Sequence, residues 1–170
     1  MKTLIIINGA PGVGKSSVSK KLASMLPNSA FFDADWSWYM HKRIKNDETV
    51  SAFFNICSCV INNHLSISHL DYVIFCWLSD KVKHWQRLKP MLDLENVNVC
   101  KFNIFCSTEE LESRIKRDKV KKPRTLEASS LLQENCLTMK NYKAINSTGK
   151  SINQTATEII NQVKRANKKN

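Results

Sequence analysis

The sequence has no apolar run that approaches the roughly 20 residues a membrane-spanning helix needs. It also has no internal repeat and no low-complexity segment. The first apolar run, residues 4–7, is too short for the core of a signal peptide, so we expect no secretion signal. These absences disfavour a membrane protein, a repeat protein and a secreted protein. They leave one globular domain over residues 1–170, which we expect to be cytoplasmic.

The chain also lacks the cysteine and histidine spacings of a metal site. Its six cysteines stand mostly in apolar patterns, and Cys57-x-Cys59 does not have the spacing of a zinc knuckle. We therefore expect six reduced, mostly buried cysteines, which is typical of a cytoplasmic protein. His64, His69 and His84 show no ligand spacing, so we expect them to be surface or structural residues.

Acidic residues are few: 15 against 26 basic residues, for a net charge of +11. Such a balance raises the hypothesis of a nucleic-acid partner. However, much of the positive charge lies in residues 114–124 and in the tail, residues 164–170. A basic flap that closes over a nucleotide would also give the first cluster, and the second is typical of a solvated chain end. Nucleic acid therefore stays an alternative partner that we do not favour.

The strongest pattern present is GAPGVGKS at residues 9–16, between an apolar run and a helical pattern. Its spacing, G-x-x-x-x-G-K-S, is that of the phosphate-binding loop (P-loop) of nucleoside-triphosphate enzymes. Glycines let successive N–H groups converge on phosphate oxygens, Lys15 would reach the β- and γ-phosphates, and Ser16 would ligate magnesium. A turn that only joins a strand to a helix is disfavoured, because all fixed positions are present. The predicted nucleotide contacts are Gly9, Ala10, Pro11, Gly12, Val13, Gly14, Lys15, Ser16 and Ser17.

Apolar runs and helical patterns alternate along the whole chain. Strands are predicted at residues 2–7, 30–33, 71–78, 97–105 and 142–146. Helices are predicted at residues 16–26, 35–45, 47–65 (capped by Asp47 or Thr49), 79–94 (interrupted near Pro90), from 107, 126–139 and 151–163, with capping boxes at Ser107 and Ser151. This alternation predicts an α/β fold, with a parallel sheet and helices on both faces.

Two carboxylates follow the predicted second strand. Asp33 and Asp35 lie two residues apart beside the P-loop, at the sheet edge where open α/β folds bind ligands. Phosphoryl transfer needs a group that orients the acceptor hydroxyl and takes its proton. The sequence therefore predicts that both carboxylates face the cleft. The alternative for Asp35 is to cap a helix that starts at Trp36, and the two roles are compatible.

Three further segments resemble the small P-loop kinases of the shikimate kinase, gluconate kinase and adenylate kinase group. Residues 31–35 resemble the F-x-D-S-D segment of shikimate kinase, residues 114–124 its arginine-rich lid, and residues 146–151 the adenine-contacting turn. The resemblance covers nearly the whole chain. It implies a three-layer fold whose five-stranded parallel sheet has the order 2-3-1-4-5, with a basic lid over approximately residues 114–126.

The same resemblance implies ATP, Mg²⁺ and individual roles. Asp33 would hold magnesium through water, and Asp35 would contact the acceptor hydroxyl. Arg114 would stack on adenine, with Ser147 and Thr148 in the adenine turn. The lid is longer than in the family pattern, so the phosphate clamp stays open between Arg117, Lys121 and Arg124. The alternative for any one of these basic residues is a solvated helix end.

The acceptor site departs from the family pattern. The third strand ends without the glycine triplet of shikimate kinase, and no arginine lies between Arg43 and Arg87, so shikimate is disfavoured. Aromatic residues stand there instead, and flat rings suit a base or a sugar face. The alternative is that two or three of them fill the core. The predicted acceptor contacts are Asp35, Trp36, Trp38, Tyr39, Arg43 and Trp77.

Three functions remain open. The first is an ATP-dependent kinase of a small hydroxylated metabolite, nucleoside, nucleotide or antibiotic, acting as a monomer or homodimer away from membranes. The second is a kinase of nucleic-acid ends. The third is a nucleotide-binding regulator with weak hydrolysis. We favour the first, because the P-loop, the acidic pair and the basic lid together supply what phosphoryl transfer needs.

Overall fold

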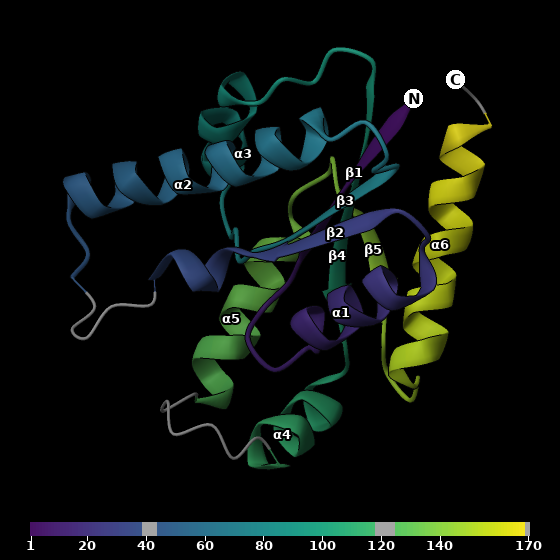
Figure 1. Ribbon diagram of the computed structural model, residues 1–170. Coiled ribbons are helices and arrows are strands. Elements are labelled where there is room, and N and C mark those ends of the chain that lie inside the picture. The colour runs from purple at the N-terminus through teal and green to yellow at the C-terminus, as the bar shows by residue number, and fades with distance from the viewer. Residues whose placement is uncertain (39–43, 118–124, 169–170) are drawn as a thin grey trace.

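The computed structural model describes residues 1–38, 44–117 and 125–168 (Figure 1). Its centre is a five-stranded sheet in the order β2-β3-β1-β4-β5, in which all neighbouring strands are parallel. The predicted parallel sheet and the order implied by the resemblance are confirmed. The strands are β1 (Lys2–Asn8), β2 (Ser29–Asp33), β3 (Tyr72–Cys76), β4 (Val97–Phe105) and β5 (Lys143–Asn146).

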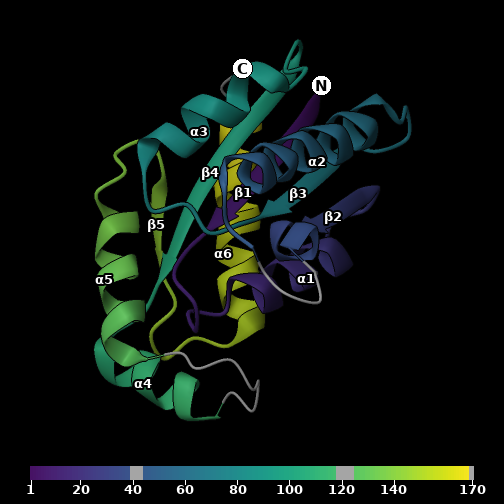
Figure 2. The same ribbon diagram turned by 90° about the vertical axis from the view of Figure 1, so that its left-hand side faces the viewer.

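Helices cover both faces of this sheet (Figure 2). On one face α1 and α6 pack together, and on the other lie α2, α3 and α5. The α-helices of the described chain are α1 (Lys15–Met25), α2 (Asp47–Ser66), α3 (Val82–Leu88), α4 (Thr108–Arg117), α5 (Leu126–Leu137) and α6 (Ile152–Asn167). Two short 3₁₀ turns cover Ala34–Trp38 and Lys89–Met91, and the second contains Pro90, where an interruption was predicted.

The central strand β1 is buried from both sides. Ile5 and Ile7 pack in the cluster beneath α1 and α6, whereas Leu4 and Ile6 pack in the cluster beneath α2, α3 and α5. A parallel strand covered on both faces reads as a continuous apolar run rather than an alternating one. This is why the run at the start of the sequence predicted a buried strand.

Side-chain caps set where two helices begin. The Asn46 side chain accepts a hydrogen bond from the Thr49 N–H at 2.8 Å, and the Asn46 N–H donates to Thr49 Oγ1 at 3.0 Å. The cap of α2 is therefore Asn46 rather than the predicted Asp47 or Thr49, and Thr49 is its return partner. At α6 the predicted capping box between Ser151 and Gln154 is confirmed.

The segment after β2 differs from the predicted helix over residues 35–45. A 3₁₀ turn forms over Ala34–Trp38, and residues 39–43 lie outside the described chain. The Asp33 carboxylate starts this turn by accepting the N–H of Asp35 at 3.0 Å. Asp33 therefore takes the capping role that was the alternative for Asp35.

Two predictions about whole classes of residue can be compared with the structure. All six cysteines are free, and five of them are buried while Cys59 is exposed, as expected for reduced core cysteines. In the part of the chain that the structure describes, no helix combines the length and the apolar character needed to cross a membrane.

Candidate functional site: a P-loop beside an acidic turn

The P-loop has the backbone shape that a phosphate needs. A Cβ atom added at Gly9 would lie 2.6 Å from the Ile104 carbonyl oxygen and 2.8 Å from Val13 Cγ2, so only glycine fits there. Gly14 has φ 95° and precedes α1, whose first turn has no side-chain cap. The N–H groups that open α1 are therefore directed at the loop, where they and the helix dipole favour an anion.

Lys15 is the second element of this cradle. It is the first residue of α1, and only 9% of it is exposed. Among the residues that the structure describes, no carboxylate lies within ion-pair distance of its ammonium group. A buried cation without a partner is costly. A triphosphate would supply the missing anion, so the loop fits the ligand that its sequence predicts.

A cavity of about 710 Å³ lies against the P-loop. Its lining includes residues 11–18 from the loop and α1, Arg114 and Arg117 from α4, and Ser147 after β5. Gly9 and Ala10, the first two residues of the loop, are not part of the lining, and Ala10 is fully buried. Thr148 is not part of the lining; its hydroxyl accepts the Ser107 N–H at 2.8 Å and so joins the turn to α4.

Arg114 connects three parts of the cavity wall. Its Nη1 donates to the Val13 carbonyl at 2.9 Å and to Ser147 Oγ at 3.0 Å, and its Nη2 donates to the Ser147 carbonyl at 2.9 Å. Its Nε donates to Glu110 Oε1 at 2.8 Å. The guanidinium edge thus fixes the P-loop to the turn after β5. The stacking of Arg114 on adenine that the resemblance implied stays a prediction.

Glu110 is the residue of this group that sequence reasoning missed. Besides Arg114, its carboxylate lies 3.7 Å from Arg117 Nη2. The predicted capping box at Ser107 is therefore only half formed: Ser107 Oγ accepts the Glu110 N–H at 3.3 Å, while the Glu110 side chain turns to the arginines. The spacing of four residues between Glu110 and Arg114 was the available signal.

Replacing Arg114 with lysine is expected to loosen the cavity. Lysine keeps the charge but cannot reproduce four hydrogen bonds in fixed directions. Because hydrogen bonds to charged groups contribute about 1.5–3 kcal/mol each, the free energy of unfolding should fall by roughly that amount. ATP affinity should fall as well. Urea unfolding and calorimetric ATP titration measure the two effects.

Lys116→Ala is the matched control for this variant. Lys116 is 72% exposed and pairs with Glu112 on the same helix at 2.7 Å. Exposed pairs of this kind contribute roughly 0–1 kcal/mol. If Arg114→Lys and Lys116→Ala change stability and ATP affinity equally little, Arg114 does not hold the cavity together.

The predicted magnesium ligands lie on either side of Cys76. Ser16 Oγ is 3.8 Å from Cys76 Sγ, and Asp33, 5% exposed, is the sheet partner of Cys76. Burial raises the pKa of the Cys76 thiol to about 12, so this sulfur is protonated. Mg²⁺ prefers oxygen ligands. Ser16 and Asp33 offer oxygen ligands here, and their predicted roles in holding Mg²⁺ stay predictions.

The 3₁₀ turn over Ala34–Trp38, which we call the acidic turn, contains three of the predicted acceptor contacts: Asp35, Trp36 and Trp38. Asp35 is exposed, and its carboxylate makes no hydrogen bond or ion pair with any described residue. Trp36 is 55% exposed and meets the Phe31 ring edge-on at 5.4 Å. Trp38 stacks on Phe53 at 4.9 Å. These side chains could form an open aromatic wall beside Asp35.

Trp77, another predicted acceptor contact, does not reach this wall. Trp77 is 2% exposed and packs on Phe75 at 5.3 Å, which places it in the core beneath α2 and α3, as the alternative for the aromatic residues had it. The remaining predicted site residues lie outside the described residues: Tyr39, Arg43, Lys121 and Arg124.

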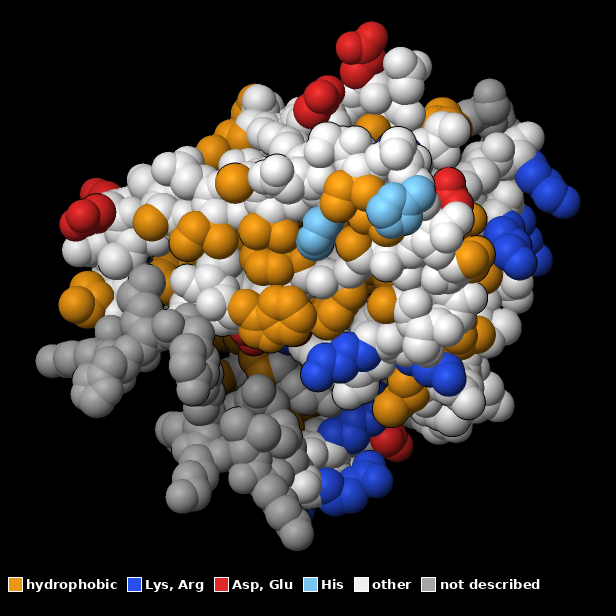
Figure 3. Space-filling model, in the orientation of Figure 1, with side chains coloured by type: hydrophobic (Ala, Val, Ile, Leu, Met, Phe, Trp, Pro, Cys, Tyr) orange, Lys and Arg blue, Asp and Glu red, His pale blue; other side chains and the backbone are white. Residues whose placement is uncertain are grey.

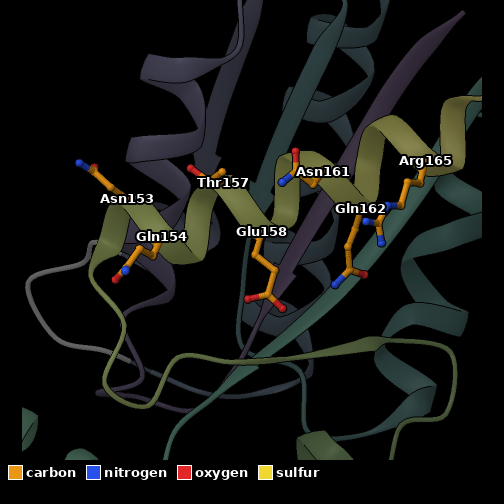
Figure 4. Close-up of a pocket in the computed structure, with 7 residues that line it drawn as sticks. All are labelled: Asn153, Gln154, Thr157, Glu158, Asn161, Gln162 and Arg165. Atoms are coloured by element: carbon orange, nitrogen blue, oxygen red, sulfur yellow. The ribbon is translucent and has the colours of Figure 1, made fainter.

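Figure 3 shows one face of the surface, and Figure 4 shows a second pocket, away from the P-loop. In Figure 3, Lys and Arg side chains gather on the lower part of the face, over α1 and α4, and hydrophobic side chains form a band over α2 and β2. Figure 4 shows a hollow of about 500 Å³ along α6. All of its lining comes from that one helix, so it is a furrow in a polar helix surface rather than an enclosed site.

Several solved structures with the same fold are kinases. The tunicamycin resistance protein of Deinococcus radiodurans aligns with a TM-score of 0.70 and 17% identity, over 96% of each chain. A gluconokinase from Sinorhizobium meliloti 1021 aligns with a TM-score of 0.65 and 15% identity, over 96% of this chain and 92% of the other. Thymidylate kinase from Candida albicans has a TM-score of 0.64, 15% identity and the same coverages, 96% and 92%. At these identities the likeness shows the fold alone.

Sequence comparison gives the family. No curated protein sequence matches the chain. The family model described as an AAA domain matches residues 5–135, which contain the whole P-loop and the acidic turn. That match covers more than half of the 170 residues. The chain therefore belongs to the AAA domain family, as a P-loop protein with the fold of the small kinases.

Proposed function

We propose that this protein is an ATP-dependent phosphotransferase that moves the γ-phosphoryl group of Mg-ATP to a hydroxyl of a small molecule. The observation that carries the proposal is the pairing of two groups at one sheet edge. Lys15 is a buried cation for which the described residues supply no anion, and Asp35 is an exposed carboxylate without a described partner. Transfer needs charge neutralisation on the phosphate side and an oriented hydroxyl on the other.

In this proposal, separate residues bind the phosphates, hold magnesium, orient the acceptor and clamp the γ-phosphate. The P-loop N–H groups and Lys15 bind the β- and γ-phosphates, and Arg114 holds the loop against the turn that would meet adenine. Magnesium, when bound by Ser16 and through water by Asp33, neutralises charge on the phosphate oxygens. Asp35 accepts a hydrogen bond from the acceptor hydroxyl and takes its proton. Arg117, with Lys121 or Arg124, clamps the γ-phosphate.

The test is a transfer assay with γ-labelled ATP and a panel of acceptors. The neighbours with this fold suggest the first members: gluconate, tunicamycin, nucleosides and nucleoside monophosphates. Label that appears in a phosphate ester with one of them supports the proposal. Label released only as inorganic phosphate, at the same rate with and without acceptors, would favour the regulator with weak hydrolysis.

A kinase of nucleic-acid ends is the second candidate, and the net charge of +11 favours it. Neutralisation of several phosphates makes nucleic-acid affinity fall steeply with salt. We expect instead that an oligonucleotide with a 5′-hydroxyl binds weakly and is not labelled. Tight, salt-dependent binding together with labelled 5′ ends would move the assignment to this second function.

A further inference from the structure

A serine, an aspartate and a histidine meet after β3, outside the P-loop cavity. Ser79 and Asp80 lie between β3 and α3, and His84 lies in the first turn of α3. The Nδ1 atom of His84 is 3.4 Å from Ser79 Oγ and 3.7 Å from Asp80 Oδ1. Two oxygen atoms, one from Ser79 and one from Asp80, therefore lie near the same ring nitrogen.

These contacts favour one tautomer of His84. The Ser79 hydroxyl donates to the Lys81 carbonyl at 3.2 Å, which leaves its oxygen able to accept from Nδ1, and the Asp80 carboxylate can only accept. This arrangement favours a proton on Nδ1, with the lone pair of the neutral ring on Nε2. No described residue hydrogen-bonds to Nε2, and 32% of the His84 side chain is exposed.

The His84 ring has one acidic and three basic residues among the groups that act on its pKa. Burial lowers the pKa of His84, Asp80 raises it, and Lys83, Lys81 and Lys45 lower it. All three lysines are exposed. Lys81 and Lys83 flank His84 in the chain, and Lys45 comes from the segment before α2.

The loop that carries this group is fixed directly to the start of the P-loop. The Ser79 N–H donates to Asn8 Oδ1 at 2.8 Å, and Asn8 Nδ2 donates to the Ser79 carbonyl at 2.8 Å. Asn8 is the last residue of β1 and precedes Gly9. The loop that carries Ser79 and Asp80 therefore lies at the same sheet edge as the P-loop.

A serine, histidine and aspartate could also suggest a hydrolase. That interpretation fails on the serine, because Ser79 is fully buried and its hydroxyl proton is committed to the Lys81 carbonyl. In a nucleophilic triad the serine would instead donate to the imidazole. Here Ser79 and Asp80 orient the ring, and the free ring nitrogen is the group that can meet a ligand.

We propose that His84, oriented by Ser79 and Asp80, is an acceptor-binding residue whose Nε2 accepts a hydrogen bond from an acceptor hydroxyl, and that Lys45, Lys81 and Lys83 select an acceptor that also carries an anionic group. This inference rests on the proposed function and gives its substrate class: a small hydroxylated anion, with either a carboxylate or a phosphate. Asp35 accepts a hydrogen bond from the reacting hydroxyl, and His84 accepts one from a second hydroxyl of the same acceptor.

The first test observes the ring itself. In the protein saturated with Mg-ADP and labelled with ¹⁵N-histidine, we expect the His84 Nε2 signal to shift when gluconate or adenosine 3′-monophosphate is added, as the carboxylate and phosphate probes. Sorbitol, the neutral counterpart of gluconate, should shift it far less, and the exposed His69 should not respond. No His84 shift with either anion, or an equal shift with sorbitol, would overturn the proposal.

Two variants separate binding from structure. His84→Asn keeps a donor near the Nδ1 position and removes the acceptor at Nε2, so the Kd of the responding probe should rise about tenfold, the value of one hydrogen bond of about 1.4 kcal/mol. His84→Gln places an oxygen near the Nε2 position and should restore binding to within about threefold. The Kd of ADP should not change in either variant. An unchanged probe Kd in His84→Asn, or equal losses in both variants, would contradict the proposal.

These outcomes are independent of the transfer assay. If His84 responds to the anions but no panel member is phosphorylated, the proposed function fails and the binding site stands. If an acceptor is phosphorylated with the same KM by wild type and His84→Asn, the proposed function stands and His84 is not part of the acceptor site.

Discussion

Asp35→Asn is expected to lower kcat for phosphoryl transfer by about 10²–10⁴-fold, the range over which a positioned base contributes. The amide can still meet a hydroxyl, but it cannot take its proton. The KM for ATP should stay within about twofold, because the nucleotide cavity is lined from other elements. Steady-state kinetics with γ-labelled ATP and the acceptor identified in the panel measures both constants.

The Asp35 prediction can be separated from a change in the fold. Asp33, not Asp35, caps the turn over Ala34–Trp38, so Asp35→Asn should leave the thermal midpoint unchanged. Asp93→Asn, an exposed carboxylate far along the chain, is the matched control and should leave kcat unchanged. If Asp35→Asn transfers phosphate at the wild-type rate, Asp35 has no chemical role and the acceptor must be activated elsewhere.

The features that the sequence predicted are those whose determinants are local. The P-loop is defined by glycine and lysine positions within eight residues, and its backbone shape follows from them. The strands were predictable because a sheet covered on both faces needs continuous apolar runs. The box between Ser151 and Gln154 is likewise complete within four residues.

The features that the sequence could not predict depend on residues far apart in the chain. Arg114 contacts Val13 across 101 positions, and Ser79 contacts Asn8 across 71. Residues 35–45 have a helical pattern, yet the Asp33 carboxylate starts a 3₁₀ turn there. Trp77 follows β3 at the ligand-binding edge of the sheet, but its ring packs on Phe75 in the core. The position of a residue after a strand predicts that it lies at the ligand-binding edge of the sheet. Whether its side chain faces the cleft or the core depends on packing against residues far away in the chain.

Lys15→Ala is expected to lower kcat/KM for transfer by about a thousandfold. The fixed positive charge of Lys15 stabilises the negative charge that develops on the phosphate in the transition state, and the loss of one such group costs a factor on that scale. The same change should not lower the free energy of unfolding of the ATP-free protein. Lys15 is nine-tenths buried, and its ammonium has no described carboxylate partner, so its removal relieves a desolvation cost. Kinetics and urea unfolding without nucleotide measure the two quantities.

Opposite effects on activity and stability distinguish a binding group from a structural one. If Lys15 held the loop together, its removal would lower the free energy of unfolding. If Lys15 serves to bind an anion, its removal weakens ATP binding and leaves the free energy of unfolding of the ATP-free protein intact. Lys20→Ala tests the same chemical change on the exposed side of α1 and should alter neither quantity. Saturating ATP should raise the thermal midpoint of the wild type and of Lys20→Ala, and much less that of Lys15→Ala. If Lys15→Ala keeps both its transfer rate and its stabilisation by ATP, the P-loop is not where the triphosphate binds, and Asp35 loses the phosphoryl donor that its role requires.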